Sequence, residues 1–282
     1  MTVPIAFTKV SGAGNDFVVV NNFQDDMDVD FASLARIVCD RHFGVGADGL
    51  LVLKKSSVTD FAMVYYNADG SWGGMCGNGG RCIARFAFLE GIAGPRQKFE
   101  ALGHIYEAEV RDDVVSLRMK DPADFRTDIT LSLSGIDHPF SFLNTGAPHA
   151  VLTDESNWND LDVRRIGREL RRHPLFAPDG TNVNFLRRED SRTVRIRTYE
   201  RGVEDETLAC GTGAVASALI AAHLYTMGSP VNVAVLSGET LRVHFAGNSG
   251  SWTDVRLEGS AHMLFSGTFV YETDPPSLRA DP

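Results

Sequence analysis

The sequence contains two copies of one pattern, in which a polar, Gly-containing turn leads to a cysteine, then to Gly-polar-Gly, and then to an apolar run of helical length. The first copy covers residues 67–91 around Cys76, and the second covers residues 199–228 around Cys210. Each cysteine is therefore expected at a helix N-terminus, where the first N–H groups lack intrahelical partners and the macrodipole is positive. Such a position stabilises a thiolate and can bind a carboxylate. Two such sites suggest paired thiols around one anionic substrate.

Other landmarks repeat with the same spacing. Four pairs keep an offset of 133 or 134 residues: Cys76 and Cys210, Gly46 and Gly180, Asn67 and Glu200, Asp16 and His149. A constant offset between independent landmarks indicates an internal duplication. We therefore predict an α/β (α+β) fold of two similar domains, each a mixed β-sheet or barrel around a central buried helix. The predicted domains are residues 1–128 and 129–262, with a C-terminal strand at about 263–282 returning to the first domain. The active site is expected in the interdomain cleft, where small-molecule sites usually lie.

In the first half, turn residues and apolar periodicity predict two strands joined by a tight loop at Asn15 and Asp16. A helix is expected from Asp30, as its N-cap, through about residue 42. The G-x-G-x-x-G match at residues 44–49 follows this helix and opens an apolar strand. A dinucleotide fingerprint would follow a strand and open a helix, so this match does not predict a nucleotide site.

In the second half, a helix is expected around residues 161–173 and another from about residue 212 to 227. The latter is apolar almost all round, which places it in the middle of a domain. Residues 121–128 are predicted to form a crossover between domains, and the tail after Asp274 to be irregular.

Composition narrows the classes of protein. The chain has 282 residues, a net charge of −10 and no long run of Lys and Arg, so a nucleic-acid or membrane partner is not expected. The N-terminus lacks the regions of a signal peptide, and no apolar run is long enough to span a bilayer, so a cytoplasmic location is expected. None of the four cysteines forms a CxxC pair, which argues against a disulfide framework or a zinc site. Cys39 and Cys82 lie on apolar helix faces and are predicted to be core residues.

Two facing thiols suit one kind of chemistry. One thiol can remove a proton from one face of a carbon while the other delivers a proton to the opposite face, which inverts the stereocentre. Backbone N–H groups of Gly77, Asn78, Gly211 and Thr212 would stabilise the charge on a neighbouring carboxylate, so neither a metal nor a cofactor is needed. His149 or Glu200 could shape which thiol is charged.

The polar residues near the two cysteines allow more than one interpretation. Asn15, Asn67 and Asn182 stand in turns, where asparagine is common for backbone reasons, so the spacing alone does not decide whether they bind substrate. His149 could equally be a hydrogen-bonded loop histidine. Glu200 and Arg201 precede the second cysteine loop as Asn67 precedes the first, which favours contact with a ligand.

Five motifs together resemble the diaminopimelate epimerase family: GAGNDFVVV, NADG…MCGNGGRC, NTGAPHAV, GTNVNFL and YERGVEDETLACGTGA. The resemblance implies a cofactor-independent homodimer that interconverts LL- and meso-2,6-diaminopimelate, a precursor of lysine and peptidoglycan. It implies that Cys76 and Cys210 are the acid/base pair and that His149 and Glu200 tune the thiols. It also implies that the reacting carboxylate is held by Gly77, Asn78, Gly211 and Thr212, and the rest of the substrate by Asn15, Asn67, Asn182, Glu200 and Arg201.

The sequence departs from the family at three positions and leaves two other functions open. Many relatives carry a substrate-contacting Gln at the position of Gly49 and an Asn at that of Ala147, and an acidic residue at that of Trp72. One alternative is a proline or hydroxyproline racemase-like enzyme with a shorter substrate. The other is a non-catalytic amino-acid-binding or redox-sensing protein in which Cys76 and Cys210 form a reversible disulfide.

Overall fold

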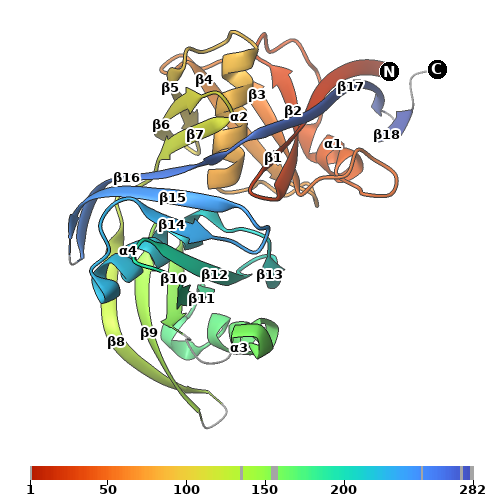
Figure 1. Ribbon diagram of the computed structural model, residues 1–282. Helices are drawn as coiled ribbons and strands as arrows, with labels where there is room; N and C mark the ends of the chain where they lie inside the picture. The colour runs from red at the N-terminus through yellow and green to blue at the C-terminus, as the bar shows by residue number, and fades with distance from the viewer. Residues whose placement is uncertain (1, 134–135, 154–157, 249, 274–275, 280–282) are drawn as a thin grey trace. The chain divides into compact units, whose positions relative to one another are not determined.

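The computed structural model describes residues 2–133, 136–153, 158–248, 250–273 and 276–279 (Figure 1). The chain divides into two units, one made of Met1–Leu117 with Ser260–Pro282 and the other of Arg118–Gly259. The prediction from the sequence placed the division between residues 128 and 129 and the start of the returning C-terminal segment at about residue 263. Within the described residues, no helix combines the length and the apolar character needed to cross a membrane.

The first unit is a mixed sheet whose strands lie in an order that differs from their order in the chain. Adjacent strands are antiparallel except for the parallel pairs β2–β3 and β4–β5. The strands in spatial order are β18 (Pro276–Arg279), β17 (His262–Thr273), β1 (Thr2–Gly12), β2 (Asn15–Asn22), β3 (Gly49–Lys54), β4 (Phe61–Asn67), β5 (Arg96–Ala101), β6 (His104–Arg111) and β7 (Val114–Arg118).

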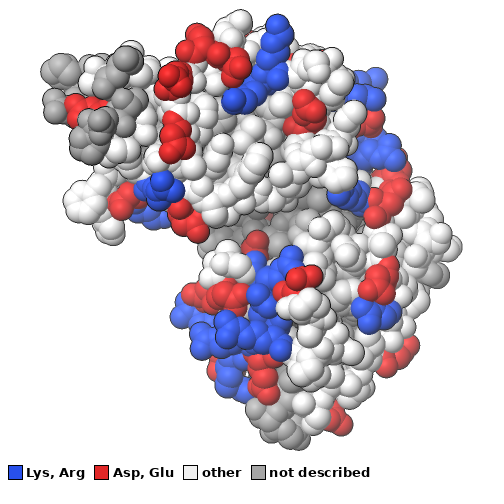
Figure 2. All heavy atoms as spheres, turned by 180° about the vertical axis from the view of Figure 1, so that it is seen from behind, with Lys and Arg blue, Asp and Glu red and all other residues white. Residues whose placement is uncertain are grey.

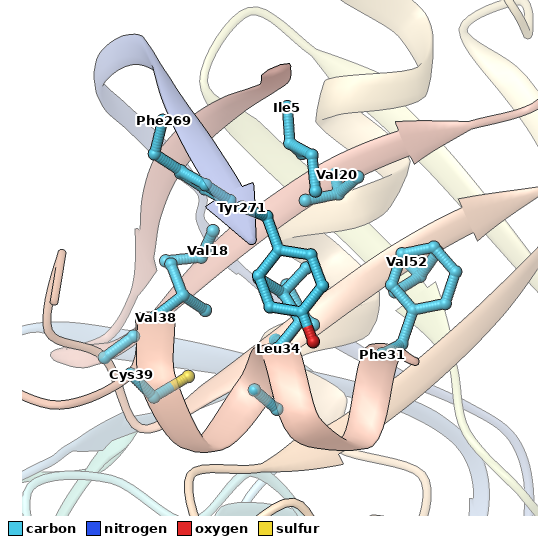
Figure 3. Packing of buried hydrophobic residues seen from close by; sticks show 13 residues of the cluster. Ile5, Val18, Val20, Phe31, Leu34, Val38, Cys39, Val52, Phe269 and Tyr271 are labelled. Carbon is cyan, nitrogen blue, oxygen red and sulfur yellow. The ribbon is translucent and has the colours of Figure 1, made fainter. Parts of the chain in front are cut away.

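Two helices pack against this sheet. Helix α2 (Gly77–Leu89) contacts β1, β2, β3, β6 and β17, so the strands surround it as the repeat predicts. Helix α1 (Phe31–Val38) packs Phe31, Leu34 and Val38 against strand residues such as Val18 and Tyr271 (Figure 3). The prediction that α1 reaches residue 42 is wrong, because the backbone turns after Val38 and the Val38 carbonyl accepts from Gly46 N instead of continuing the helix.

The second unit repeats this arrangement. Its adjacent strands are antiparallel except for the parallel pairs β10–β11 and β12–β14, and the short β13 (Asp205–Thr207) pairs with β12. The main strands in spatial order are β8 (Ala123–Leu133), β9 (Ile136–Asn144), β10 (Pro148–Thr153), β11 (Asn182–Arg188), β12 (Thr193–Glu200), β14 (Val231–Ala234), β15 (Thr240–Asn248) and β16 (Ser251–Ser260).

Helix α4 (Gly211–Tyr225) is the counterpart of α2 and contacts β9, β10, β11, β12, β14 and β15. Its uniform apolar surface is explained by strands on several sides, as expected from the sequence. Helix α3 (Val163–Arg171) is the counterpart of α1 and packs Val163, Ile166 and Leu170 into a second core with Phe185. Short 3-10 turns, Trp158–Asp160 and Pro174–Phe176, flank α3.

The comparison of the two units corrects two sequence-based predictions. Residues 121–128 are not only a crossover, because β8 begins at Ala123 and pairs with β9. In the first unit, the strand in the equivalent place beside β1 is β17, from the far end of the chain. Part of the tail predicted to be irregular forms β18, which pairs with β17, whereas residues 274–275 and 280–282 lie outside the described residues.

Helix α3 is rich in arginine, although the net charge of the whole chain is negative. Figure 2 shows Lys and Arg side chains with Asp and Glu side chains among them on the face drawn there. On α3, Arg164 pairs with Asp205 at 2.7 Å and Arg171 with Glu204 at 2.9 Å. These arginines therefore hold α3 to the strand and turn beside it, and each is matched by a carboxylate.

Candidate active site

Cys76 is the N-cap residue of α2. Its backbone is extended, with φ −102° and ψ 116°, and its Sγ accepts a hydrogen bond from Gly79 N at 3.4 Å. The next residues, Gly77 and Asn78, contribute N–H groups from the first turn, where a helix has no carbonyls of its own to satisfy them. Asn78 is buried and its Oδ1 accepts from Arg81 Nη2 at 3.1 Å. The start of α2 thus combines a thiol with an anion-favouring group of N–H donors.

Asn15 joins Cys76 to a network of charged side chains. The Cys76 thiol donates to Asn15 Oδ1 at 3.4 Å, and Asn15 Nδ2 donates to Asp48 Oδ2 at 2.5 Å. Asp48 also accepts from Arg41 Nη2 at 2.8 Å, and Arg41 bridges to Asp16. Burial alone would raise the pKa of Asp16, but hydrogen bonds from Arg41 and Lys9 outweigh it and hold that pKa below its usual value. Asn15 and Asp16, predicted to lie in a tight loop, begin β2 after the turn at residues 13–14, and the Asn15 side chain is held by other side chains.

Cys210 occupies the equivalent N-cap position of α4, with φ −117° and ψ 112°. Its Sγ lies 3.6 Å from Thr212 Oγ1, and Thr212 Oγ1 lies 3.0 Å from His149 Nε2. On the other side of the ring, His149 Nδ1 lies 3.0 Å from Asn184 Nδ2. Cys210, Thr212 and His149, all selected from the sequence, therefore stand in one hydrogen-bonded line.

His149 is fully buried, and its environment keeps it neutral. Burial, with a smaller contribution from the charge of Arg201, lowers the pKa of His149 from 6.5 to about 3. A neutral imidazole has one N–H donor and one acceptor nitrogen. If one ring nitrogen accepts a hydrogen bond from a neighbour, the other nitrogen therefore carries the proton and donates to the neighbour on its side. His149 is hydrogen-bonded on both sides of its ring, to Asn184 and to Thr212, but it lies in β10 and not in a loop.

The remaining candidates of the second unit are tied to one another. Asn182 Oδ1 accepts from Arg201 N at 2.8 Å, and Asn182 Nδ2 donates to Pro148 O at 3.1 Å. Glu200 Oε2 accepts from Thr207 Oγ1 at 3.0 Å, across the β12–β13 hairpin. Asn182 therefore anchors the backbone that carries Arg201, and β13 supports Glu200.

In the first unit, Asn67 is the last residue of β4 and precedes the turn that leads to α2. Its Nδ2 donates to Ser71 Oγ at 2.9 Å, and its N–H binds Ser71 O at 2.9 Å. Within this unit the structure brings Asn15 and Cys76 into contact, while the Asn67 side chain donates to Ser71 in the turn that follows it.

Gly49 lies against the ring of Tyr65. A Cβ atom added to Gly49 would lie 2.4 Å from Tyr65 Cε2 and 2.6 Å from Tyr66 O. Tyr65 also packs edge-on against Phe17, with ring centroids 5.8 Å apart. The Tyr65 ring therefore occupies the space that a side chain at position 49 would need.

Two predictions about the other cysteines are confirmed, since Cys39 and Cys82 are both buried in the core of the first unit. Cys39 packs beside Val38 in Figure 3, and burial raises the pKa of its thiol to about 12. A thiol with so high a pKa is a poor nucleophile at neutral pH.

The sequence reasoning missed Asp48 and Asn184, the residues that orient Asn15 and His149. Asp48 lies inside the G-x-G-x-x-G match, which leads into a strand, β3, as the sequence predicts. Asn184 lies two residues after Asn182 on β11, and the period of a strand puts both on one face. This alternation along the strand could have identified Asn184 as a candidate site residue.

Solved structures show the class of fold. The chain is similar to a PhzF-family phenazine biosynthesis protein of Bacillus anthracis, with a TM-score of 0.72 and 14% identity over 94% of this chain and 99% of that one. It is also similar to a hydroxyproline epimerase of Agrobacterium vitis, with a TM-score of 0.68 and 17% identity over 94% of this chain and 92% of that one. The fold is that of a class of duplicated α/β proteins that includes amino-acid epimerases.

Sequence comparisons identify the family within that class. The model of the diaminopimelate epimerase family matches residues 7–125 and 141–251. Diaminopimelate epimerases of Chlorobaculum tepidum and Aquifex aeolicus are 45% and 40% identical to this chain, over 93% and 94% of its length and 100% and 98% of their own. The chain belongs to the diaminopimelate epimerase family.

Proposed function

We propose that the protein interconverts LL-2,6-diaminopimelate and meso-2,6-diaminopimelate without a cofactor, with Cys76 and Cys210 as the two acid/base residues. The observation that carries the proposal is the presence, in each of two duplicated units, of a cysteine at the N-cap position of the buried central helix. The names of the family and of the relatives supply the substrate.

In this mechanism one cysteine is a thiolate and the other a thiol. The thiolate removes the α-proton of the substrate, and the electrons of the broken C–H bond move into the adjacent carboxylate. N–H groups of Gly77, Asn78, Gly211 and Thr212 stabilise the charge that develops there. The thiol then donates its proton to the opposite face of the carbon, which inverts the centre.

The other predicted site residues have supporting roles in the proposal. Asn15, Asn67, Asn182, Glu200 and Arg201 would hold the remaining polar groups of the substrate, with the Arg201 guanidinium suited to a carboxylate. His149 and Glu200 would tune the thiols. The protein is further proposed to act in the cytoplasm as a homodimer, in the synthesis of lysine and peptidoglycan precursors, with no nucleic-acid or membrane partner.

Proton NMR in deuterium oxide tests the proposal. With LL-diaminopimelate and the reduced protein, we expect meso product with deuterium at the α-carbon. Cys76→Ala and Cys210→Ala should each abolish turnover, while Cys39→Ala, a core cysteine, should retain it. Entry of α-deuterium into proline, with none into diaminopimelate, would move the protein to the shorter-substrate enzymes. No α-exchange with either substrate would favour a binding protein.

A further inference from the structure

The side-chain hydrogen bonds at the two cysteines have opposite polarity. In the first unit the orientation of Asn15 is decided by Asp48, because a carboxylate only accepts hydrogen bonds. Asp48 Oδ2 takes Asn15 Nδ2 at 2.5 Å, so the amide nitrogen faces Asp48 and the amide oxygen faces Cys76. A carbonyl oxygen next to sulfur accepts from a thiol and repels a thiolate. Asn15 therefore favours protonated Cys76. The Gly79 N–H donates to the same sulfur and by itself favours a thiolate, so the Asn15 oxygen is the group in this unit that favours the thiol.

Asp48 is itself held by hydrogen bonds, and it therefore keeps the side-chain amide of Asn15 in one orientation. The Asp48 carboxylate accepts from Asp16 N at 3.2 Å and from Arg41 Nη2 at 2.8 Å. Asp16 in turn accepts from Arg41 and pairs with Lys9 at 2.6 Å. The two acidic side chains and the two basic ones form one network, in which Asp48 is the member that contacts Asn15.

In the second unit the direction of the hydrogen bonds is set by Asn184, which is fully buried. Its Oδ1 accepts from Thr198 Oγ1 at 2.9 Å, and its Nδ2 faces the Ala150 carbonyl at 3.4 Å. Turning the amide round would set its oxygen against that carbonyl. A Cβ added to Gly213 would lie 2.4 Å from Asn184 Oδ1, so the lack of a side chain there lets Asn184 approach α4.

The orientation of the Asn184 amide determines the direction of the hydrogen bonds from His149 to Cys210. Asn184 Nδ2 donates to His149 Nδ1, so the single ring proton of the neutral histidine stands on Nε2. Nε2 then donates to Thr212 Oγ1, which leaves the Thr212 hydroxyl proton for Cys210 Sγ. The sulfur meets a donor, and a donor stabilises a thiolate. The low pKa of His149 agrees with the neutral ring that this chain of donors requires.

We propose that in the resting enzyme Cys210 is the thiolate and Cys76 the thiol, and that Asn184 and Asp48 are the positioning residues that set this difference. The inference rests on the proposed two-cysteine function for its catalytic meaning. Cys210 is then the base for whichever substrate isomer presents its α-hydrogen to it, and Cys76 is the acid. After that turnover Cys210 carries the proton and Cys76 the charge, so return to the resting state requires a proton exchange.

Alkylation of the reduced, substrate-free protein tests the assignment without using activity. The rate of carbamidomethylation by iodoacetamide is measured at each cysteine from about pH 5 to about pH 10 and resolved by peptide mass spectrometry. The midpoint of each rate profile gives the thiol pKa independently of access to the sulfur. We expect the Cys210 midpoint to lie at least one pKa unit below that of Cys76, which is about tenfold in thiolate per unit. Equal midpoints or the reverse order would overturn the proposal.

Matched variants separate the effect of hydrogen-bond direction on the thiol pKa from the effect of packing. Thr212→Ser keeps the hydroxyl and should keep the low Cys210 midpoint, whereas Thr212→Val removes it and should raise the midpoint. Asp48→Asn keeps an acceptor for Asn15, whereas Asp48→Ala releases Asn15 and should lower the Cys76 midpoint further than Asp48→Asn does. Equal effects within either pair would show that charge or packing, and not donor direction, sets the order.

A spectroscopic measurement tests the Asn184 step in the unmodified protein. Nitrogen-15 NMR of labelled histidine should show His149 neutral with its proton on Nε2 at neutral pH. A proton on Nδ1 would contradict the proposed chain of donors. The α-deuterium assay on the same samples keeps the two proposals distinct, because absent exchange with the expected midpoints would reject the epimerase and leave the thiol assignment standing.

Discussion

His149 is the residue whose burial carries the clearest consequence for stability. Its pKa falls from 6.5 to about 3 in the folded protein, so the unfolded chain binds a proton at higher pH than the folded chain does. Its contribution to stability is complete above pH 6.5 and is lost as the pH falls toward 3. Between pH 6.5 and pH 5 we expect a loss of about 2 kcal/mol in the free energy of unfolding.

Urea unfolding of the protein and of His149→Gln at these two pH values measures that loss. The variant removes the titrating group, so its free energy of unfolding should change less over the interval. Parallel changes in the two proteins would show that His149 is not the group responsible.

Gly49 and Gly74 provide a second residue-scale prediction. A Cβ at Gly49 meets the Tyr65 ring and the Tyr66 carbonyl, whereas a Cβ at Gly74 meets nothing within 4 Å. Overpacking against a ring and a backbone atom typically costs about 1–3 kcal/mol. We expect Gly49→Ala to lower the free energy of unfolding by about that amount and Gly74→Ala to leave it within about 0.5 kcal/mol. Chemical denaturation of both variants decides the matter, and similar stabilities would mean that Tyr65 moves aside without cost.

At the scale of elements, the two cysteines differ as helix caps. Cys76 Sγ accepts from Gly79 N, but the Cys210 side chain makes no capping hydrogen bond to α4. We expect Cys76→Ala to destabilise the protein by about 1 kcal/mol and Cys76→Ser, a stronger N-cap, to leave stability intact or raise it. Both should lose epimerase turnover, because a serine hydroxyl is a far weaker acid than a thiol.

Thermal unfolding and α-deuterium exchange, measured on the same variants, separate the capping role from the chemical one. Cys210→Ala is the control and should destabilise α4 less than Cys76→Ala destabilises α2. A larger loss at Cys210 would contradict the difference between the caps.

The helices were more predictable than the strands. The starts of α2 and α4 follow from the Cys-Gly-polar-Gly pattern, because capping and apolar runs are local signals. The β8 strand and the β18 strand were not predicted, because their own sequences are largely polar and each is stabilised by pairing with the neighbouring strand, β9 or β17. Leu89, the last residue of α2, is 55% exposed because the helix ends there.

At the scale of the whole molecule, the duplication was the most informative property of the sequence. It predicted two similar units and a cysteine in an equivalent place in each, because a repeated spacing survives when identity does not. The orienting contacts could not be predicted in the same way. Asn15 meets Asp48 and His149 meets Thr212 across separations of 33 and 63 residues, and only the fold brings those partners together.

The returning strand β17 gives the last prediction. It pairs with β1 along most of its length and places Phe269 and Tyr271 in the core of the first unit. Loss of one large buried aromatic side chain costs about 3–5 kcal/mol, and removal of the whole strand also leaves β1 as an open edge. Deletion of residues 260–282 should therefore unfold the first unit, while the strand pairs of the second unit, which lie within Arg118–Gly259, should persist.

Hydrogen–deuterium exchange followed by peptide mass spectrometry measures each unit separately. Peptides from residues 2–117 of the truncated protein should exchange at the rate of unfolded chain, and peptides from β9 to β12 should stay protected. Deletion of residues 280–282 alone is the control, because it leaves β17 complete. Protection of β1 to β4 in the longer deletion would mean that the first unit holds its sheet without the C-terminal strand. In that case the chain end that returns beside β1 adds to stability but is not required for the fold.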